Sequence, residues 1–157
     1  MRYSNRFIAI TAILFSSIQA SAQPKLVNVK PLYNYDFVGD ASDLKPGINC
    51  FVITQRKHFD KFFGKTNRPD TPHFAKENVL VLLMPETRKD SKLSFKRVDT
   101  KAGDFIEAYC NLDLYKGTVN YKFYPMALAV IPKYPGIKKV NFYNDKTRLI
   151  KSVEIKN

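Results

Sequence analysis

Apolar and polar residues alternate with a period of two along much of the second half of the chain. Leu93 and Phe95 alternate with polar neighbours, and within residues 105–114 every second side chain is apolar. Residues 119–123 continue the same pattern. Alternation of this kind is typical of strands that are buried on one face and solvated on the other. We therefore expect an antiparallel meander here.

Other strands are indicated by apolar runs without alternation. Residues 78–84 are almost entirely apolar, which predicts a central strand covered on both faces. The runs at 50–54 and 126–131 predict two further buried strands. Residues 140–143 and 149–155 then form an expected hairpin around a turn at Asn144.

One helix is expected between the first two buried strands. Phe59, Phe62 and Phe63 are spaced to form an aromatic stripe on one helical face. Thr54 is positioned to cap the start of this helix, and Gly64 to end it. The stripe is typical of a face that packs into the core.

These elements predict an α+β fold, mainly β, with one helix packed on a largely antiparallel sheet. Residues 23–157 have the usual length of a single small domain with one core. Residues 23–46 leave two alternatives open, because they are either part of that core or an extended N-terminal arm.

Residues 1–22 resemble a secretory signal peptide. Arg2 and Arg6 precede an apolar run at residues 7–15, and Ala20-Ser-Ala22 forms a cleavage site with small residues. The run is shorter than the roughly 20 residues that a membrane-spanning helix needs. We expect cleavage after Ala22 and an exported, periplasmic or secreted protein that does not span the membrane.

The chain is strongly basic, with a formal net charge of +12. Without Arg2 and Arg6, 24 basic and 14 acidic residues remain. Export argues against nucleic acid as the partner and favours an acidic protein or anionic cell-envelope material, such as lipopolysaccharide or a wall polymer. Basic and aromatic residues in and before the final hairpin form a candidate binding surface, for which a merely solvated strand edge is the alternative. They are Lys133, Tyr134, Lys138, Lys139, Tyr143, Lys146, Arg148 and Lys151.

Cys50 and Cys110 are the only cysteines. An oxidising compartment permits a disulfide between them, but both lie in apolar, strand-like runs that suit buried thiols equally well. The sequence leaves these two states open, because a bond requires α-carbons within about 7 Å of each other.

Familiar catalytic patterns are missing from the sequence. The two histidines, His58 and His73, lack the spacing of metal ligands, and neither a nucleophile elbow nor a phosphate-binding glycine loop occurs. The acidic residues are scattered, and only Glu107 lies within a strand pattern, on a face that we expect to be solvated. We therefore assign no catalytic, cofactor or metal residues, and keep a small hydrolase as the least favoured alternative.

The order of elements over residues 48–131 resembles the C-terminal domain of the PrcB family, the accessory subunits of protease complexes. Members share a strand, an aromatic helix and a segment of the form D-F-x-x-E-x-V-L-V-V. Phe74, Glu77 and Val79 match that segment, while His73 stands at the acidic position. Residues 84–91 replace the glycine-rich segment that follows in the family. The resemblance implies a non-enzymatic exported module that binds or stabilises another protein, such as a protease.

Overall fold

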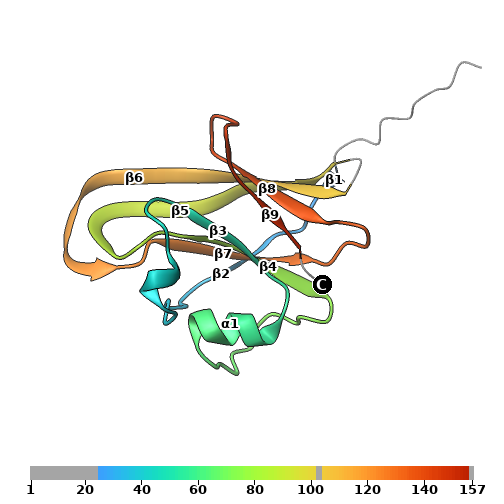
Figure 1. Cartoon of the computed structure of the whole chain (residues 1–157), viewed down its shortest axis with the longest axis horizontal. Helices are drawn as coiled ribbons and strands as arrows, with labels where there is room; N and C mark the ends of the chain where they lie inside the picture. The colour runs from blue at the N-terminus through green and yellow to red at the C-terminus, as the bar shows by residue number, and fades with distance from the viewer. Residues whose placement is uncertain (1–24, 102–103, 156–157) are drawn as a thin grey trace, which may run out of the picture.

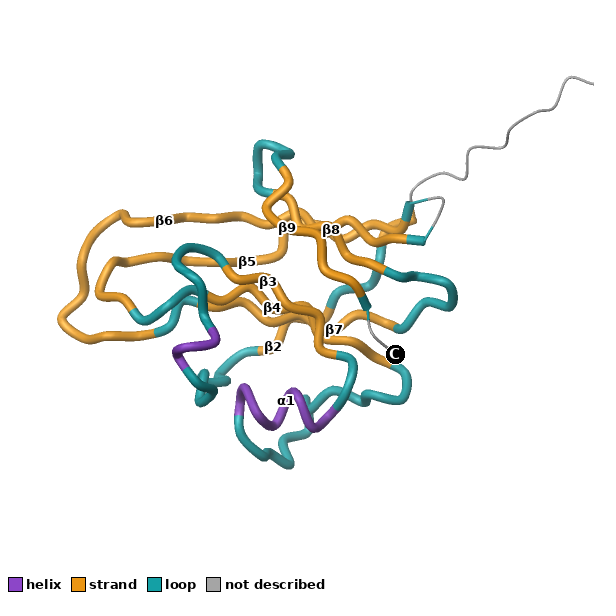
Figure 2. Tube along the Cα trace, viewed as in Figure 1, coloured by secondary structure: helices purple, strands orange, loops and turns teal. Residues whose placement is uncertain are grey.

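The structure is a computed structural model that describes residues 25–101 and 104–155, in which nine strands form two sheets (Figures 1 and 2). The expected signal peptide and its cleavage site lie outside the described residues. Sheet A has the strand order β1-β5-β6-β8-β9, and sheet B has the order β2-β7-β4-β3. The strands are β1 (Lys25–Leu26), β2 (Lys30–Leu32), β3 (Asn49–Ile53), β4 (Glu77–Leu83), β5 (Thr87–Thr100), β6 (Phe105–Phe123), β7 (Met126–Pro132), β8 (Lys139–Tyr143) and β9 (Leu149–Glu154).

Strand pairing is antiparallel throughout both sheets except between β6 and β8, which run parallel. The predicted α+β, mainly β class with one α-helix is therefore confirmed. The division of the strands into two stacked sheets was not expected from the sequence, which indicates strands but not their partners.

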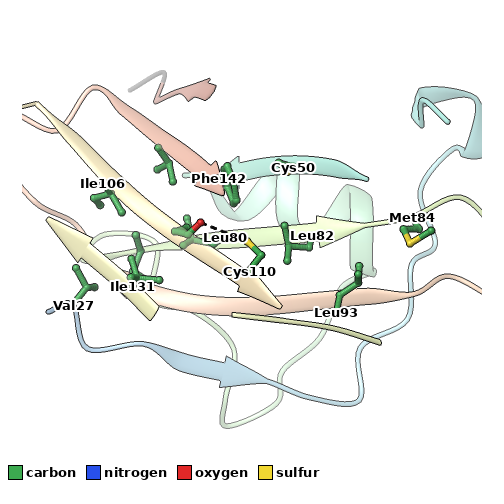
Figure 3. Packing of buried hydrophobic residues seen from close by; sticks show 13 residues of the cluster. Val27, Cys50, Leu80, Leu82, Met84, Leu93, Ile106, Cys110, Ile131 and Phe142 are labelled. Carbon is green, nitrogen blue, oxygen red and sulfur yellow. Dashed lines mark hydrogen bonds between the residues drawn. The ribbon is translucent and has the colours of Figure 1, made fainter. Parts of the chain in front are cut away.

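The main core lies between the two sheets (Figure 3). Leu80 and Leu82 of β4 point into it and meet Ile106 of β6 and Phe142 of β8, and all four side chains are fully buried or nearly so. Val79, Val81 and Leu83 point to the opposite side of sheet B, and they too are buried. The prediction that 78–84 form a strand covered on both faces is thus confirmed.

Helix α1 (Arg56–Phe63) covers the outer face of sheet B (Figure 1). Phe59 and Phe63 are buried against that sheet, which confirms that the aromatic stripe belongs to the core. Gly64 ends the helix with φ 77°, a left-handed conformation that glycine adopts without strain. The expected cap at Thr54 is wrong, because the helix starts one residue later and Gln55 takes the cap position without a side-chain hydrogen bond.

Residues 25–46 contribute to both sheets and to the aromatic cluster that packs between α1 and sheet B. An extended arm was one of the two alternatives for this segment. β1 pairs with the end of β5, and β2 pairs with β7. Tyr35 and Phe37 are buried beside α1, where the Tyr35 ring lies 5.3 Å from that of Phe59. The Arg68 guanidinium lies 4.4 Å from the centre of the Tyr35 ring and forms an ion pair with Asp70 at 3.0 Å, which fastens this segment to the loop after the helix.

Two boundaries in the meander differ from the sequence expectation. The alternating pattern starts at Leu93, but β5 already begins at Thr87. A single strand, β6, spans the two stretches that were expected as separate strands. The β5–β6 pair absorbs the extra residues as irregularities in register, between Thr87 and Ser91 and again between Phe95 and Arg97.

Candidate functional site

The basic surface expected from the sequence is divided in the structure. Lys133 and Tyr134 line a cavity at one end of the sandwich. Lys138 and Lys139 lie at the start of β8, where Lys138 forms an ion pair with Asp104 at 3.7 Å and Lys139 lies 5.4 Å from the centre of the Phe105 ring. These four residues belong to the end of the molecule where β8 starts.

Lys146 and Arg148 lie in the turn at the other end of the β8–β9 hairpin. The Asn144 side-chain oxygen accepts the backbone N–H groups of both residues, at 3.1 Å and 2.8 Å. Both residues are exposed. The turn is therefore well defined, but it lies a full strand length from Lys138 and Lys139.

Lys151 lies on the inner side of β9, the edge strand of sheet A. It is the register partner of the buried Phe142, and its ammonium lies 5.4 Å from the centre of the Phe51 ring on β3. An inward-pointing charge on an edge strand opposes pairing with another sheet, so this lysine has a structural use of its own.

A row of side chains crosses the outer face of sheet A, which we call the open face. Arg97 of β5, Tyr109 of β6 and Tyr143 of β8 are register neighbours, and Leu149 of β9 continues the row. The Arg97 guanidinium lies 4.4 Å from the centre of the Tyr109 ring, whose plane is inclined by only 22° to that of Tyr143 at 5.4 Å. This tyrosine row is therefore a continuous cation–π and ring stack.

A second row of polar side chains lies beside the first. It consists of Asp99, Glu107, Asn141 and Ser152, one from each of the same four strands. The Ser152 hydroxyl donates to the Asn141 side-chain oxygen at 2.7 Å. Asp99 and Glu107 face each other directly across two strands, an arrangement that destabilises a sheet unless the charges are compensated.

Basic side chains supply that compensation. Arg97 Nε lies 2.8 Å from Asp99, and Lys101 Nζ lies 3.4 Å from Glu107, which also accepts a hydrogen bond from the Tyr109 hydroxyl at 2.9 Å. Burial and this hydrogen bond to a carboxylate raise the pKa of Tyr109. The expectation that Glu107 is solvated is wrong, because the residue is only 8% exposed beneath its partners.

In these two ion pairs the positive charge is the more exposed one. The side chains of Arg97 and Lys101 are 53% and 43% exposed, whereas those of Asp99 and Glu107 are each 10% exposed. A molecule that docks on this face meets the cations first, with the carboxylates beneath them.

Cys50 of β3 and Cys110 of β6 both lie in the core between the sheets, and both are free thiols in the structure (Figure 3). The Cys110 thiol lies 3.6 Å from the Ala108 carbonyl oxygen, as the dashed line in Figure 3 indicates. Burial raises the pKa of each thiol to about 12. Of the two states that the sequence leaves open, the structure holds the free thiols.

His58 and His73 are both exposed. Among the described residues, no three histidine, cysteine or carboxylate side chains gather as metal ligands would. No helix within residues 25–101 and 104–155 has the length and apolar character needed to cross a membrane.

No family model matches the chain, and neither a curated protein nor a solved structure matches it.

Proposed function

We propose that this protein is a non-enzymatic, exported binding module that docks on another protein through the open face. The observation that carries the proposal is the tyrosine row, in which Arg97, Tyr109 and Tyr143 are stacked across three strands of a solvent-facing sheet. Tyrosine and arginine are enriched at the energetic centres of protein interfaces.

The row is pre-organised for binding. Its side chains are held by stacking and by the pairs with Asp99 and Glu107, so ordering them on association costs little entropy. Because the cation is the more exposed member of both ion pairs beside the row, we expect the partner to present an acidic surface there. The resemblance to PrcB, an accessory subunit family, supports a protein partner such as a protease.

The proposal is tested by a pull-down from the native envelope fraction with two matched variants. Tyr143→Ala removes the outer ring of the row, and Tyr121→Ala removes a 61% exposed tyrosine from the far part of β6. We expect the wild type and Tyr121→Ala to retain one stoichiometric protein at high salt, and Tyr143→Ala to lose it. Equal retention by both variants would rule out the open face.

A second candidate function is the binding of anionic envelope material. Two groups of basic residues favour it. Lys138, whose side chain is 78% exposed, lies next to Lys139 at one end of the hairpin. Lys146 and Arg148 are exposed at the other end. Binding of this kind weakens with added salt. If it is the function, Lys138→Glu with Lys139→Glu abolishes retention on lipopolysaccharide-coated beads, while Tyr143→Ala leaves it unchanged.

A further inference from the structure

A cavity of about 240 Å³ opens between the sheets near the end of β7 and the start of β8. Three isoleucines, Ile106, Ile137 and Ile155, contribute apolar walls, and Asn78 and Lys133 contribute polar groups. The open face does not include this cavity, because Ile106 belongs to the inner side of β6.

Asn78 is the unusual member of the cavity wall. It lies in β4 with the same alternation as Leu80 and Leu82, so its side chain points between the two sheets. The residue is 5% exposed, and its buried side-chain oxygen has no hydrogen-bond partner within the part of the chain that the structure describes. A buried acceptor without a donor is destabilising, so this oxygen is suited to accept an N–H from a molecule in the cavity.

Lys133 also lines this cavity. Its backbone N–H donates to the Lys76 carbonyl at 2.8 Å, which fixes the start of the loop between β7 and β8. Its ammonium lies 3.4 Å from the Thr54 carbonyl and belongs to an exposed residue. An ammonium group has three donors, so it can bind a carboxylate while keeping the Thr54 contact.

We propose that this cavity binds the carboxyl-terminal residue of a peptide chain. The terminal carboxylate pairs with Lys133, the backbone N–H of the same residue donates to the Asn78 oxygen, and an apolar side chain packs among the three isoleucines. The proposal rests on the proposed function in one respect, namely that the partner is a protein. It adds a site that is separate from the open face.

The size and lining of the cavity favour a peptide end over an acetylated amino sugar. Its volume is below the roughly 300–1,000 Å³ that is usual for pockets binding drug-sized ligands, which suits a single residue. An amino sugar also offers an amide N–H, but its ring hydroxyls would be buried against isoleucines without hydrogen bonds, at a cost.

The experiment uses the protein of residues 23–157 with labelled isoleucine methyl groups and follows them by NMR. Three probes are compared: acetyl-Gly-Ala-Leu with a free carboxylate, the same peptide with a terminal amide, and N-acetylglucosamine. We expect the free carboxylate peptide to shift the methyl signals of Ile106, Ile137 and Ile155 in a saturable way. The amide form should bind at least tenfold more weakly.

Variants identify the groups responsible. Lys133→Gln should weaken binding of the carboxylate peptide at least fivefold, and Asn78→Leu should abolish it. Lys138→Gln is the matched control, because it removes the same charge from the same loop at a residue that pairs with Asp104 outside the cavity. Lys133 is exposed, so its variant tests the proposal even if Asn78→Leu does not fold.

The proposal is overturned if the two peptides bind equally, if neither binds, or if N-acetylglucosamine alone shifts the isoleucine signals. It is also overturned if Lys133→Gln and Lys138→Gln have the same effect. If one of these results is obtained and the pull-down still captures a protein through the open face, only the peptide site is refuted. The proposed function then stands.

Discussion

The outer faces of the two sheets differ in chemistry and in covering. On sheet B, aromatic side chains of α1 and of residues 35–37 close over Val79, Val81 and Leu83. On sheet A, the equivalent face carries Arg97, Tyr109 and Tyr143 in a stack beside two neutralised carboxylates. The outer face of sheet B is therefore covered by side chains of this chain itself. The open face of sheet A is a polar and aromatic surface with Arg97 and Lys101 exposed, and for this reason we propose it as the binding surface.

The largest difference between the two faces should appear when one aromatic side chain is removed from each. Phe59→Ala deletes a ring that is 0% exposed, and we expect it to reduce the free energy of unfolding by about 3–5 kcal/mol. Tyr143→Ala on the open face should cost less than about 1 kcal/mol, because the ring is partly solvated. Urea unfolding of both variants measures the difference, and similar losses would mean that the open face is a structural layer too.

The next largest effect should come from the charges of the open face. Arg97→Ala leaves Asp99, whose side chain is 10% exposed, without its ion pair, and we expect a loss of about 1–3 kcal/mol. Lys122→Ala is the control, since its pair with Glu86 is largely solvated and should contribute about 0–1 kcal/mol. Urea unfolding would contradict this account if the two variants lost the same stability.

The core that joins the two sheets offers a third test. With pKa values of about 12, Cys50 and Cys110 should not react with a thiol reagent at pH 8 until the protein unfolds, and two thiols should then appear. Between the ordinary value of 9.0 and about 12, the unfolded chain ionises its thiols and the folded protein does not. The stability that the two protonated thiols contribute should therefore be fully present below pH 9, and it should be lost as the pH rises from 9 towards 12.

A disulfide between Cys50 and Cys110, the other state that the sequence leaves open, gives the opposite result in the same assay. If the two sheets are covalently joined in protein purified from the envelope, no thiol appears on unfolding until a reductant is added. A count of zero without reductant and two with it would establish the bond.

The smallest effect on stability should follow changes in the β8–β9 turn. Lys146→Glu combined with Arg148→Glu replaces two exposed residues whose backbone N–H groups, not their side chains, hold the turn. We expect a change within about 0.5 kcal/mol, measured by urea unfolding. A larger loss would show that this end of sheet A depends on side-chain contacts of these residues.

Most elements of the fold could be predicted because burial leaves a local signal. The run 78–84 and the stripe Phe59, Phe62 and Phe63 are strongly apolar, and both were assigned correctly. The partners of the strands could not be predicted, since register depends on contacts between distant segments. The parallel pairing of β6 with β8 is such a case, because nothing near Tyr109 or Tyr143 in sequence indicates it.

The open face was missed for the same reason. Arg97 and Tyr109 become neighbours only after the irregularity between Phe95 and Arg97 shifts the register of β5. Glu107 looks solvated in the sequence because its ion pair with Lys101 forms only once the chain is folded. The clustering of basic residues in the final hairpin was visible, but folding distributes them over both ends of the hairpin and its inner edge.

Docking through the open face is best tested by the envelope pull-down with the wild type, Tyr143→Ala and Tyr121→Ala at low and high salt. We expect one stoichiometric protein that survives high salt with the wild type and with Tyr121→Ala, and is lost with Tyr143→Ala. Retention of that protein by Tyr143→Ala, or capture of anionic glycan alone that is released by salt, would contradict the assignment of the open face as a protein-docking surface.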